Sequence, residues 1–84
     1  MKYTVLLSRQ AEKFYKKLDA KLKVQVRECL IGLEDSAHAG KRLHGDLKDN
    51  YSLQVRKLRI IYTISEKDKI VYVIAIGPRK KVYQ

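Results

Sequence analysis

The stretch Tyr51–Ile64, YSLQVRKLRIIYTI, decides the fold because its side chains alternate between apolar and polar twice, with a short break between the two runs. Residues 51–56 carry apolar side chains at 51, 53 and 55, and residues 58–64 carry them at 58, 60, 62 and 64. A period of two residues is typical of a strand with one buried face and one open face. The break at Lys57 is short, so the two runs predict a β-hairpin.

Two further strands are predicted on either side of this hairpin in the sequence. Residues 69–76 follow the polar turn SEKDK and are almost wholly apolar. Such a run is typical of a strand covered on both faces, which places it inside the sheet. Residues 3–7, YTVLL, predict a short strand near the N-terminus.

Two helices are predicted between the first strand and the hairpin. Ser8 and Asp19 are suitable N-cap residues, because their side-chain oxygens can accept from backbone N–H groups that a helix leaves unpaired. The first helix has an apolar stripe at helical spacing, formed by Ala11, Phe14, Tyr15 and Leu18. The second ends near Ser36, and its stripe consists of Leu22, Val26, Cys29, Leu30 and Leu33.

The predicted order is therefore β-α-α-β-β-β, an α+β fold in one domain covering residues 1–84. Two N-terminal helices are expected to pack on one face of a small, mainly antiparallel, four-stranded sheet. Residues 37–50, AHAGKRLHGDLKDN, are predicted to be a loop because they contain glycine, aspartate and asparagine turn formers.

The charge favours an anionic partner. The chain has 19 Lys and Arg against 9 Asp and Glu, for a formal net charge of +10, and no acid follows Asp68. Such a field attracts nucleic acid above all, although an acidic protein or a merely solvated basic surface fits the same composition. Polar groups at every second residue of a strand lie roughly 7 Å apart, close to the phosphate spacing of an extended single strand.

Most enzyme classes lack their required residues in this chain. There is no glycine-rich phosphate loop, no pair of cysteines and no nucleophile elbow, and Cys29 is predicted to be a small core residue. His38 and His44 are a poor metal pair, so neither metal nor cofactor is expected; His44 is either a solvated loop residue or a titratable group near a site. The chain has no signal-peptide pattern and no apolar run of 18 residues, which predicts a cytoplasmic protein without membrane contact.

One reaction suits a basic groove without metal or cofactor. RNA is cut when its own 2′-OH attacks the adjacent phosphate, so a protein need only align the atoms, stabilise charge and assist proton transfer. The tail RKKVYQ places Tyr83 after Arg79, Lys80 and Lys81. Arginine suits phosphate oxygens, and neighbouring cations favour ionisation of a phenol.

Four segments in order carry a resemblance to a known family: SRQAEKFYKKLD, GKRLHGDL, YSLQVRKLRIIYTI and VYVIAIGPRKKVY. With them the chain resembles the RelE/ParE superfamily of toxins from toxin–antitoxin modules. The resemblance implies a small sheet packed on two helices, with a concave basic face. RelE-type members cleave mRNA in the ribosomal A site and are neutralised by a co-expressed antitoxin. The implied partners are thus the ribosome, mRNA and a cognate antitoxin bound in a hetero-oligomer.

The resemblance also implies which residues act. Arg59 and Arg79 correspond to the family's arginines for phosphate and transition-state charge, and Tyr83 to the tyrosine that stacks on the nucleotide or assists proton transfer. Two family lysines fall at Ser52 and Gln54, and many relatives have histidine at Pro78. The residues expected to bind RNA are Ser52, Gln54, Arg56, Lys57, Lys80 and Lys81.

Other readings of the same residues remain open. The lysine replacements favour a ParE-like inhibitor of DNA gyrase without nuclease activity, or a weakened RNA-binding relative. Arg56 and Arg59 also fit solvated positions on an open sheet face. Arg79 also fits an ion pair with Asp46 or an antitoxin acid, and Tyr83 also fits a ring that packs over the sheet edge and pins the tail.

Overall fold

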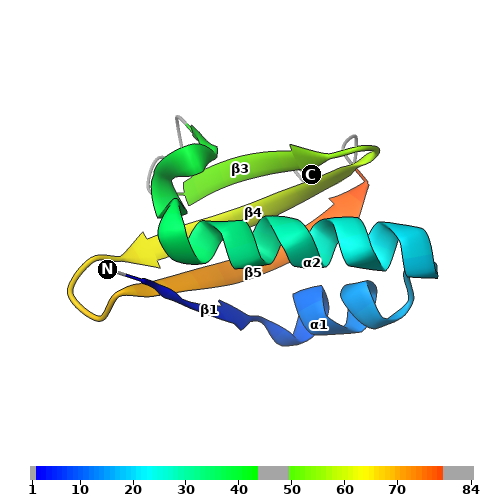
Figure 1. The fold of residues 1–84 in the computed structure, drawn as a ribbon, viewed down its shortest axis with the longest axis horizontal. Helices are drawn as coiled ribbons and strands as arrows, with labels where there is room; N and C mark the ends of the chain where they lie inside the picture. The colour runs from blue at the N-terminus through cyan, green and yellow to red at the C-terminus, as the bar shows by residue number, and fades with distance from the viewer. Residues whose placement is uncertain (1, 44–49, 79–84) are drawn as a thin grey trace.

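The computed structural model describes residues 2–43 and 50–78 (Figure 1). The predicted order of helices and strands is confirmed, with two additional short elements after the second helix. The elements are β1 (Thr4–Leu7), α1 (Arg9–Lys16), α2 (Ala20–Asp35), the 3-10 helix η1 (Ala37–Ala39), β2 (Lys41–Arg42), β3 (Asn50–Val55), β4 (Leu58–Ser65) and β5 (Ile70–Pro78).

The strands form one sheet in the order β1-β5-β4-β3-β2. β1 runs parallel to β5, and the other neighbours are antiparallel. The α+β class and the interior position of β5 are thus as predicted, but the sheet has five strands instead of four. The fifth is β2, which lies in the segment predicted to be a loop.

One buried side chain adds to the β2–β3 pairing in holding β2 and η1 to the sheet. Tyr62 has no exposed surface, and its hydroxyl donates to the carbonyl oxygen of Ala37 at 3.0 Å and accepts from the amide of Gly40 at 2.9 Å. A Cβ on Gly40 would collide with that hydroxyl and lie 2.9 Å from the carbonyl oxygen of Ser52. The contact of a distant tyrosine, rather than any local pattern, therefore fixes this segment.

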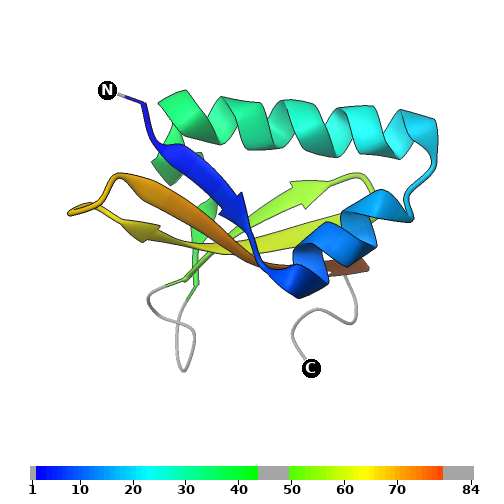
Figure 2. The same cartoon turned by 90° about the horizontal axis from the view of Figure 1, so that it is seen from below.

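The core lies between the sheet and the helices, and α2 runs along one face of the sheet (Figures 1 and 2). Both helices contribute, and Cys29 packs against this core as predicted; burial raises the pKa of its thiol. The largest fully buried side chains are Val26, Leu33, Ile60, Tyr62, Val71, Val73 and Ile76. Within residues 2–43 and 50–78, no helix is long and apolar enough to cross a membrane.

Both predicted helix caps are confirmed. The Ser8 hydroxyl accepts from the amide of Ala11 at 3.1 Å, and the Asp19 carboxylate accepts from the amide of Leu22 at 2.8 Å. The first helix ends at Lys16, with Lys17 as its C-cap, rather than continuing to residue 18. These caps set the direction in which each helix leaves the preceding segment.

The hairpin also differs from the prediction at its turn. Val55 pairs with Leu58, so Arg56 and Lys57 form a two-residue connection and Arg56 is not part of a strand. Arg56 has a φ of 57°, in the left-handed region that favours glycine. Tight hairpin turns require positive φ because their twist must match that of the strands.

Candidate nucleic-acid interface

The sheet face away from the core carries the polar residues of the hairpin. In the β3–β4 register, Ser52 lies opposite Ile61 and Gln54 lies opposite Arg59. In the β4–β5 register, Arg59 also lies opposite Gly77. Arg59 is therefore flanked by β3 on one side and by the end of β5 on the other. We call this face, defined by Ser52, Gln54 and Arg59, the open face.

Arg59 is anchored on the open face by Ser52. Its Nη1 donates to the Ser52 hydroxyl at 3.2 Å, and its Nε is buried. Ser52, one of the residues expected to bind RNA, is only 6% exposed. The physical reason is that the Arg59 side chain uses the hydroxyl as an acceptor instead of leaving it to water. Ser52 therefore positions the guanidinium of Arg59. It does not supply the positive charge that a family lysine would bring to this position.

Gln54 is exposed on the open face beside Arg59. Its amide nitrogen donates to the carbonyl oxygen of Arg56 at 3.3 Å, so the side chain lies along β3 toward the turn. A neutral amide contributes hydrogen bonds but no charge at this place. The cationic character of the open face therefore comes from other residues.

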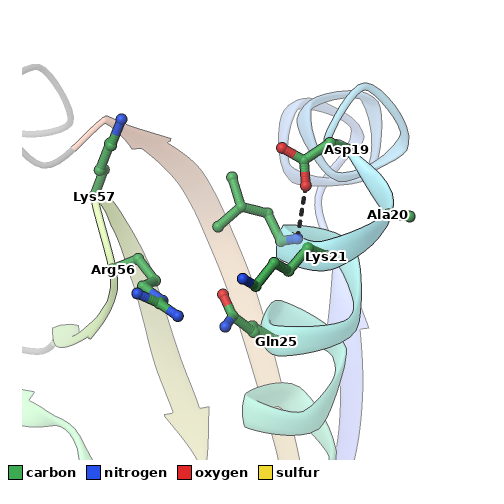
Figure 3. Close-up of a pocket in the computed structure, with 7 residues that line it drawn as sticks. Asp19, Ala20, Lys21, Gln25, Arg56 and Lys57 are labelled. Atoms are coloured by element: carbon green, nitrogen blue, oxygen red, sulfur yellow. Dashed lines mark hydrogen bonds between the residues drawn. The ribbon is translucent and has the colours of Figure 1, made fainter.

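Arg56 does not belong to the open face, contrary to the sequence prediction. Its guanidinium points toward Gln25 of α2 on the helix side of the molecule (Figure 3). With the Gln25 amide oxygen facing it, that oxygen accepts from Nε at 3.3 Å and Nη2 at 3.2 Å. The alternation of the sequence pointed to the wrong side because the strand ends at Val55 and the turn redirects the next side chain. Lys57, the other turn residue, is exposed.

Lys41 is a cation on this face that the sequence prediction missed. It pairs with Ser52 across β2 and β3, and it is exposed. Directly opposite residues of an antiparallel pair share a face, with Cβ atoms about 4.5–5.5 Å apart. Lys41 therefore lies beside the position of one missing family lysine. A strand of two residues is too short to show an alternation of apolar and polar side chains. The one sequence signal for a cation here was the basic pair, Lys41 and Arg42, that follows Gly40.

The remaining predicted site residues are not described by the structure. Arg79, Lys80, Lys81 and Tyr83 lie outside the described residues, as do His44 and Asp46. β5 ends at Pro78, which is paired with Leu58, the neighbour of Arg59 in the chain. Residue 79 therefore follows a position next to Arg59, and its assigned role stays a prediction.

A second polar cluster lies at the other end of β4. Glu66 accepts from the Tyr3 hydroxyl at 2.7 Å, and its other oxygen lies 2.7 Å from Nε2 of His38 and the first 3.4 Å from Nζ of Lys69. The hydrogen bond from Tyr3 lowers the pKa of Glu66, and the same bond raises the pKa of Tyr3. Within residues 2–43 and 50–78, no group of three metal-ligating side chains is present. This cluster joins η1, the N-terminal segment and the β4–β5 turn, roughly 20 Å along the strand from Arg59.

The comparisons with known proteins identify the family. The family model described as "ParE toxin of type II toxin-antitoxin system, parDE" matches residues 5–83. The chain belongs to the ParE toxin family of type II toxin–antitoxin systems. The resemblance seen in the sequence, to the RelE/ParE superfamily, is thereby confirmed.

Individual relatives of this toxin agree with that assignment. It is 28% identical over 83 residues to a RelE-like toxin protein of Escherichia coli, covering 96% of this chain and 87% of the relative. Its fold matches a chain of the toxin–antitoxin complex RelBE2 of Mycobacterium tuberculosis, with a TM-score of 0.85, 23% identity and coverage of 94% and 100%. The fold also matches that of the isolated E. coli RelE toxin, with a TM-score of 0.78 and 28% identity. This match covers 96% of this chain and 90% of that toxin.

Proposed function

We propose that this toxin is a metal-independent endoribonuclease that cuts mRNA on the ribosome by attack of the 2′-OH on the adjacent phosphate. The observation that supports this best is the anchored guanidinium of Arg59, held by Ser52 on the open face of the sheet. A fixed cation at a developing negative charge lowers a barrier more than a mobile one, because it needs no reorganisation during the reaction.

The chemistry divides among a few side chains. RNA supplies the nucleophile, so the protein aligns the 2′-oxygen with the scissile phosphate and stabilises charge on its oxygens. Arg59 pairs the non-bridging oxygens through its guanidinium, whose planar fork matches them. Arg79, the residue after Pro78, supplies a second guanidinium, and Tyr83 stacks on the nucleotide and assists proton transfer, as the family resemblance implies.

Lys41 supplies a cation that β3 lacks. Family lysines fall at positions 52 and 54, where this chain has serine and glutamine, but Lys41 lies directly across from Ser52 on β2. Its ammonium is a compact charge on a flexible stem, which suits contact with a backbone phosphate. The cations of the open face thus extend from Lys41 on β2, past Ser52, to Arg59 on β4.

We also propose an acidic antitoxin as the protein partner. The solved structures similar to this chain include toxin–antitoxin complexes from M. tuberculosis, E. coli and Pyrococcus horikoshii. A net charge of +10 attracts an acidic polypeptide over the same distances as it attracts RNA. Binding across Lys41 and Arg59 on the open face would neutralise the toxin by competition with mRNA.

A second function has two observations in its favour. The family model that matches is that of ParE, and the Ser52 hydroxyl is engaged by Arg59 rather than placed as a base. A chain with this arrangement can act as a gyrase inhibitor that binds its target without cutting RNA. The two functions predict different products in the same set of assays.

The test uses purified toxin in a reconstituted translation reaction, with mRNA 5′ ends mapped and a gyrase supercoiling assay run in parallel. Wild-type toxin is expected to give cuts at positions fixed by the ribosome. Arg59→Ala is expected to slow cutting about 10²–10³-fold, the usual cost of one preorganised charge donor. Arg27→Ala, which removes an exposed arginine of α2, is the matched control and should cut like wild type. Intact mRNA with inhibited supercoiling would instead establish the gyrase alternative.

A further inference from the structure

The outer face of α2 carries two apolar side chains that are half exposed in the described structure. Val24 is 53% exposed and Ile31 is 50% exposed. They lie seven residues apart, which is close to two turns of helix, so they share one line along the surface. Figure 2 shows that α2 is the outermost layer on its side of the molecule, farther from the sheet than α1. This line of the helix is therefore accessible to a partner.

The charges of α2 are arranged in the opposite sense to its macrodipole. The first half of the helix carries three cations and the second half three acids, so α2 is neutral while the whole chain has a net charge of +10. A helix is stabilised by acids near its N-terminus and by cations near its C-terminus. The first turn of α2 contains no acid and its last turn no cation, so the arrangement is unfavourable for the isolated helix. The cations are Lys21, Lys23 and Arg27, and the acids are Glu28, Glu34 and Asp35.

Contacts within the chain do not offset this arrangement. Within residues 2–43 and 50–78, none of the six charged side chains of α2 forms an ion pair. No cation of α2 stands three or four residues from an acid of α2, whereas Lys23 and Arg27 are a like-charged pair at i and i+4. Lys23 lies over the ring of Tyr15, with its Nζ 5.8 Å from the ring centroid. The charge pattern is therefore complementary to a surface outside the chain.

We propose that α2 packs antiparallel against α2 of a second copy of this chain, in a two-fold symmetric dimer. With the two-fold axis at the middle of the helix, Val24 of one copy lies at the level of Ile31 of the other. Lys21 of one copy lies at the level of Glu34 and Asp35 of the other. The cationic half of each helix thus meets the acidic half of its partner, and the two macrodipoles oppose each other.

A second copy is the occupant that this pattern favours. A neutral helix whose halves carry opposite charges is complementary to itself when reversed, whereas RNA or an acidic polypeptide would be repelled by the acids of the second half. At the centre of the dimer, Arg27 and Glu28 of both copies form a neutral group of four charges. Since the rest of the chain carries the whole excess charge, α2 is also the face at which two copies repel each other least.

The dimer leaves the open face uncovered, because α2 lies on the other side of the sheet (Figure 2). One helix about 24 Å long from each copy makes an interface below the usual size of stable complexes. We therefore expect a weak dimer, whose population rises with protein concentration.

The experiment measures self-association of the purified full-length toxin by sedimentation equilibrium, with two charge-reversed variants. Lys21→Glu with Lys23→Glu gives both halves of α2 a net negative charge, and Glu34→Lys with Asp35→Lys gives both halves a net positive charge. Each variant is expected to dimerise at least tenfold more weakly than the wild type. Each also agrees better with the macrodipole, so the melting temperature of its monomer should not fall, which separates lost association from lost folding.

Mixing the two variants is the sharpest part of the test. The negative α2 of one variant attracts the positive α2 of the other at both ends, so an equimolar mixture should restore dimers that contain one copy of each. The matched control is Lys41→Glu with Lys67→Glu, which reverses two exposed lysines outside α2. It changes the net charge as much as the first variant does, and it should dimerise no more weakly than the wild type.

The apolar contact is tested in the same assay. Ile31→Gln should weaken the dimer at least tenfold, whereas Leu6→Gln, at a similarly exposed position of β1, should not. A wild-type toxin that stays monomeric up to its solubility limit would overturn the inference. So would charge-reversed variants that dimerise like the wild type, or a mixture of them that stays monomeric. Neither outcome depends on whether the toxin cuts RNA, so the inference and the proposed function fail separately.

Discussion

Replacing Tyr62 by phenylalanine removes a single oxygen atom from the core and tests how β2 is held. The hydroxyl donates to the buried carbonyl oxygen of Ala37 and accepts from the partly buried amide of Gly40. The ring keeps its place, because it stacks on Tyr51 with centroids 5.5 Å apart. The change therefore isolates the two hydrogen bonds from the packing.

The expected loss of stability follows from those two bonds. Each typical hydrogen bond contributes about 1 kcal/mol, and a buried group left unpaired costs about 1–3 kcal/mol. We expect Tyr62→Phe to lower the free energy of unfolding by about 2–3 kcal/mol. For a chain of this size, total stability is about 4–13 kcal/mol, so the loss is a large fraction. The melting temperature should fall by about 10–20 °C.

Urea unfolding and calorimetry measure the loss, and amide hydrogen exchange at Lys41 reports whether β2 opens locally. Tyr72→Phe is the matched control, since that side chain is 42% exposed, and it should change stability by less than about 0.5 kcal/mol. A Tyr62→Phe variant within the same 0.5 kcal/mol, with unchanged exchange at Lys41, would refute the reasoning that this hydroxyl holds η1 and β2.

Three other perturbations have defined outcomes. Gly40→Ala should destabilise the protein because its Cβ would collide with the buried tyrosine hydroxyl, whereas Gly32→Ala, with nothing within 4 Å of its Cβ, should be neutral or stabilising in thermal melts. The Tyr3 hydroxyl lowers the pKa of Glu66 from its ordinary value of 4.5, so that stabilisation is present above about pH 4.5 and lost as the pH falls further. Glu66→Gln should therefore show a shallower decline of its urea midpoint below that pH; an unchanged decline would contradict the assignment. Lys41→Ala should reduce the slope of log affinity against log salt for single-stranded RNA by about 0.7, and an unchanged slope would exclude a phosphate contact.

The fold could be predicted because its main signals are local. The alternation of the hairpin, the apolar run of β5 and the caps Ser8 and Asp19 each depend on neighbours within a few residues. Such signals are readable in a single sequence. β2 was missed because two residues have no period, and because Tyr62, 22 residues from Gly40, fixes it.

The candidate site was predicted in part for the same physical reason. Arg59 was placed on the correct face because it lies inside a regular strand. Arg56 was placed on the wrong face because its positive φ, set by the hairpin twist, ends the alternation. The burial of Ser52 depends on where the Arg59 side chain folds, which no pattern of residue types records. The roles of Arg79 and Tyr83 stay predictions.

Cleavage by the substrate's own 2′-OH is tested most directly with a ribosome-bound mRNA that carries one 2′-deoxynucleotide immediately 5′ of the mapped cut. The wild-type toxin is expected to cut the all-ribose mRNA, leaving a 2′,3′-cyclic phosphate, and to spare the substituted bond while still binding the complex. Cutting of the deoxy-substituted bond at the same rate would contradict the proposed reaction. Failure to cut either mRNA, with gyrase inhibited, would contradict the nuclease function itself.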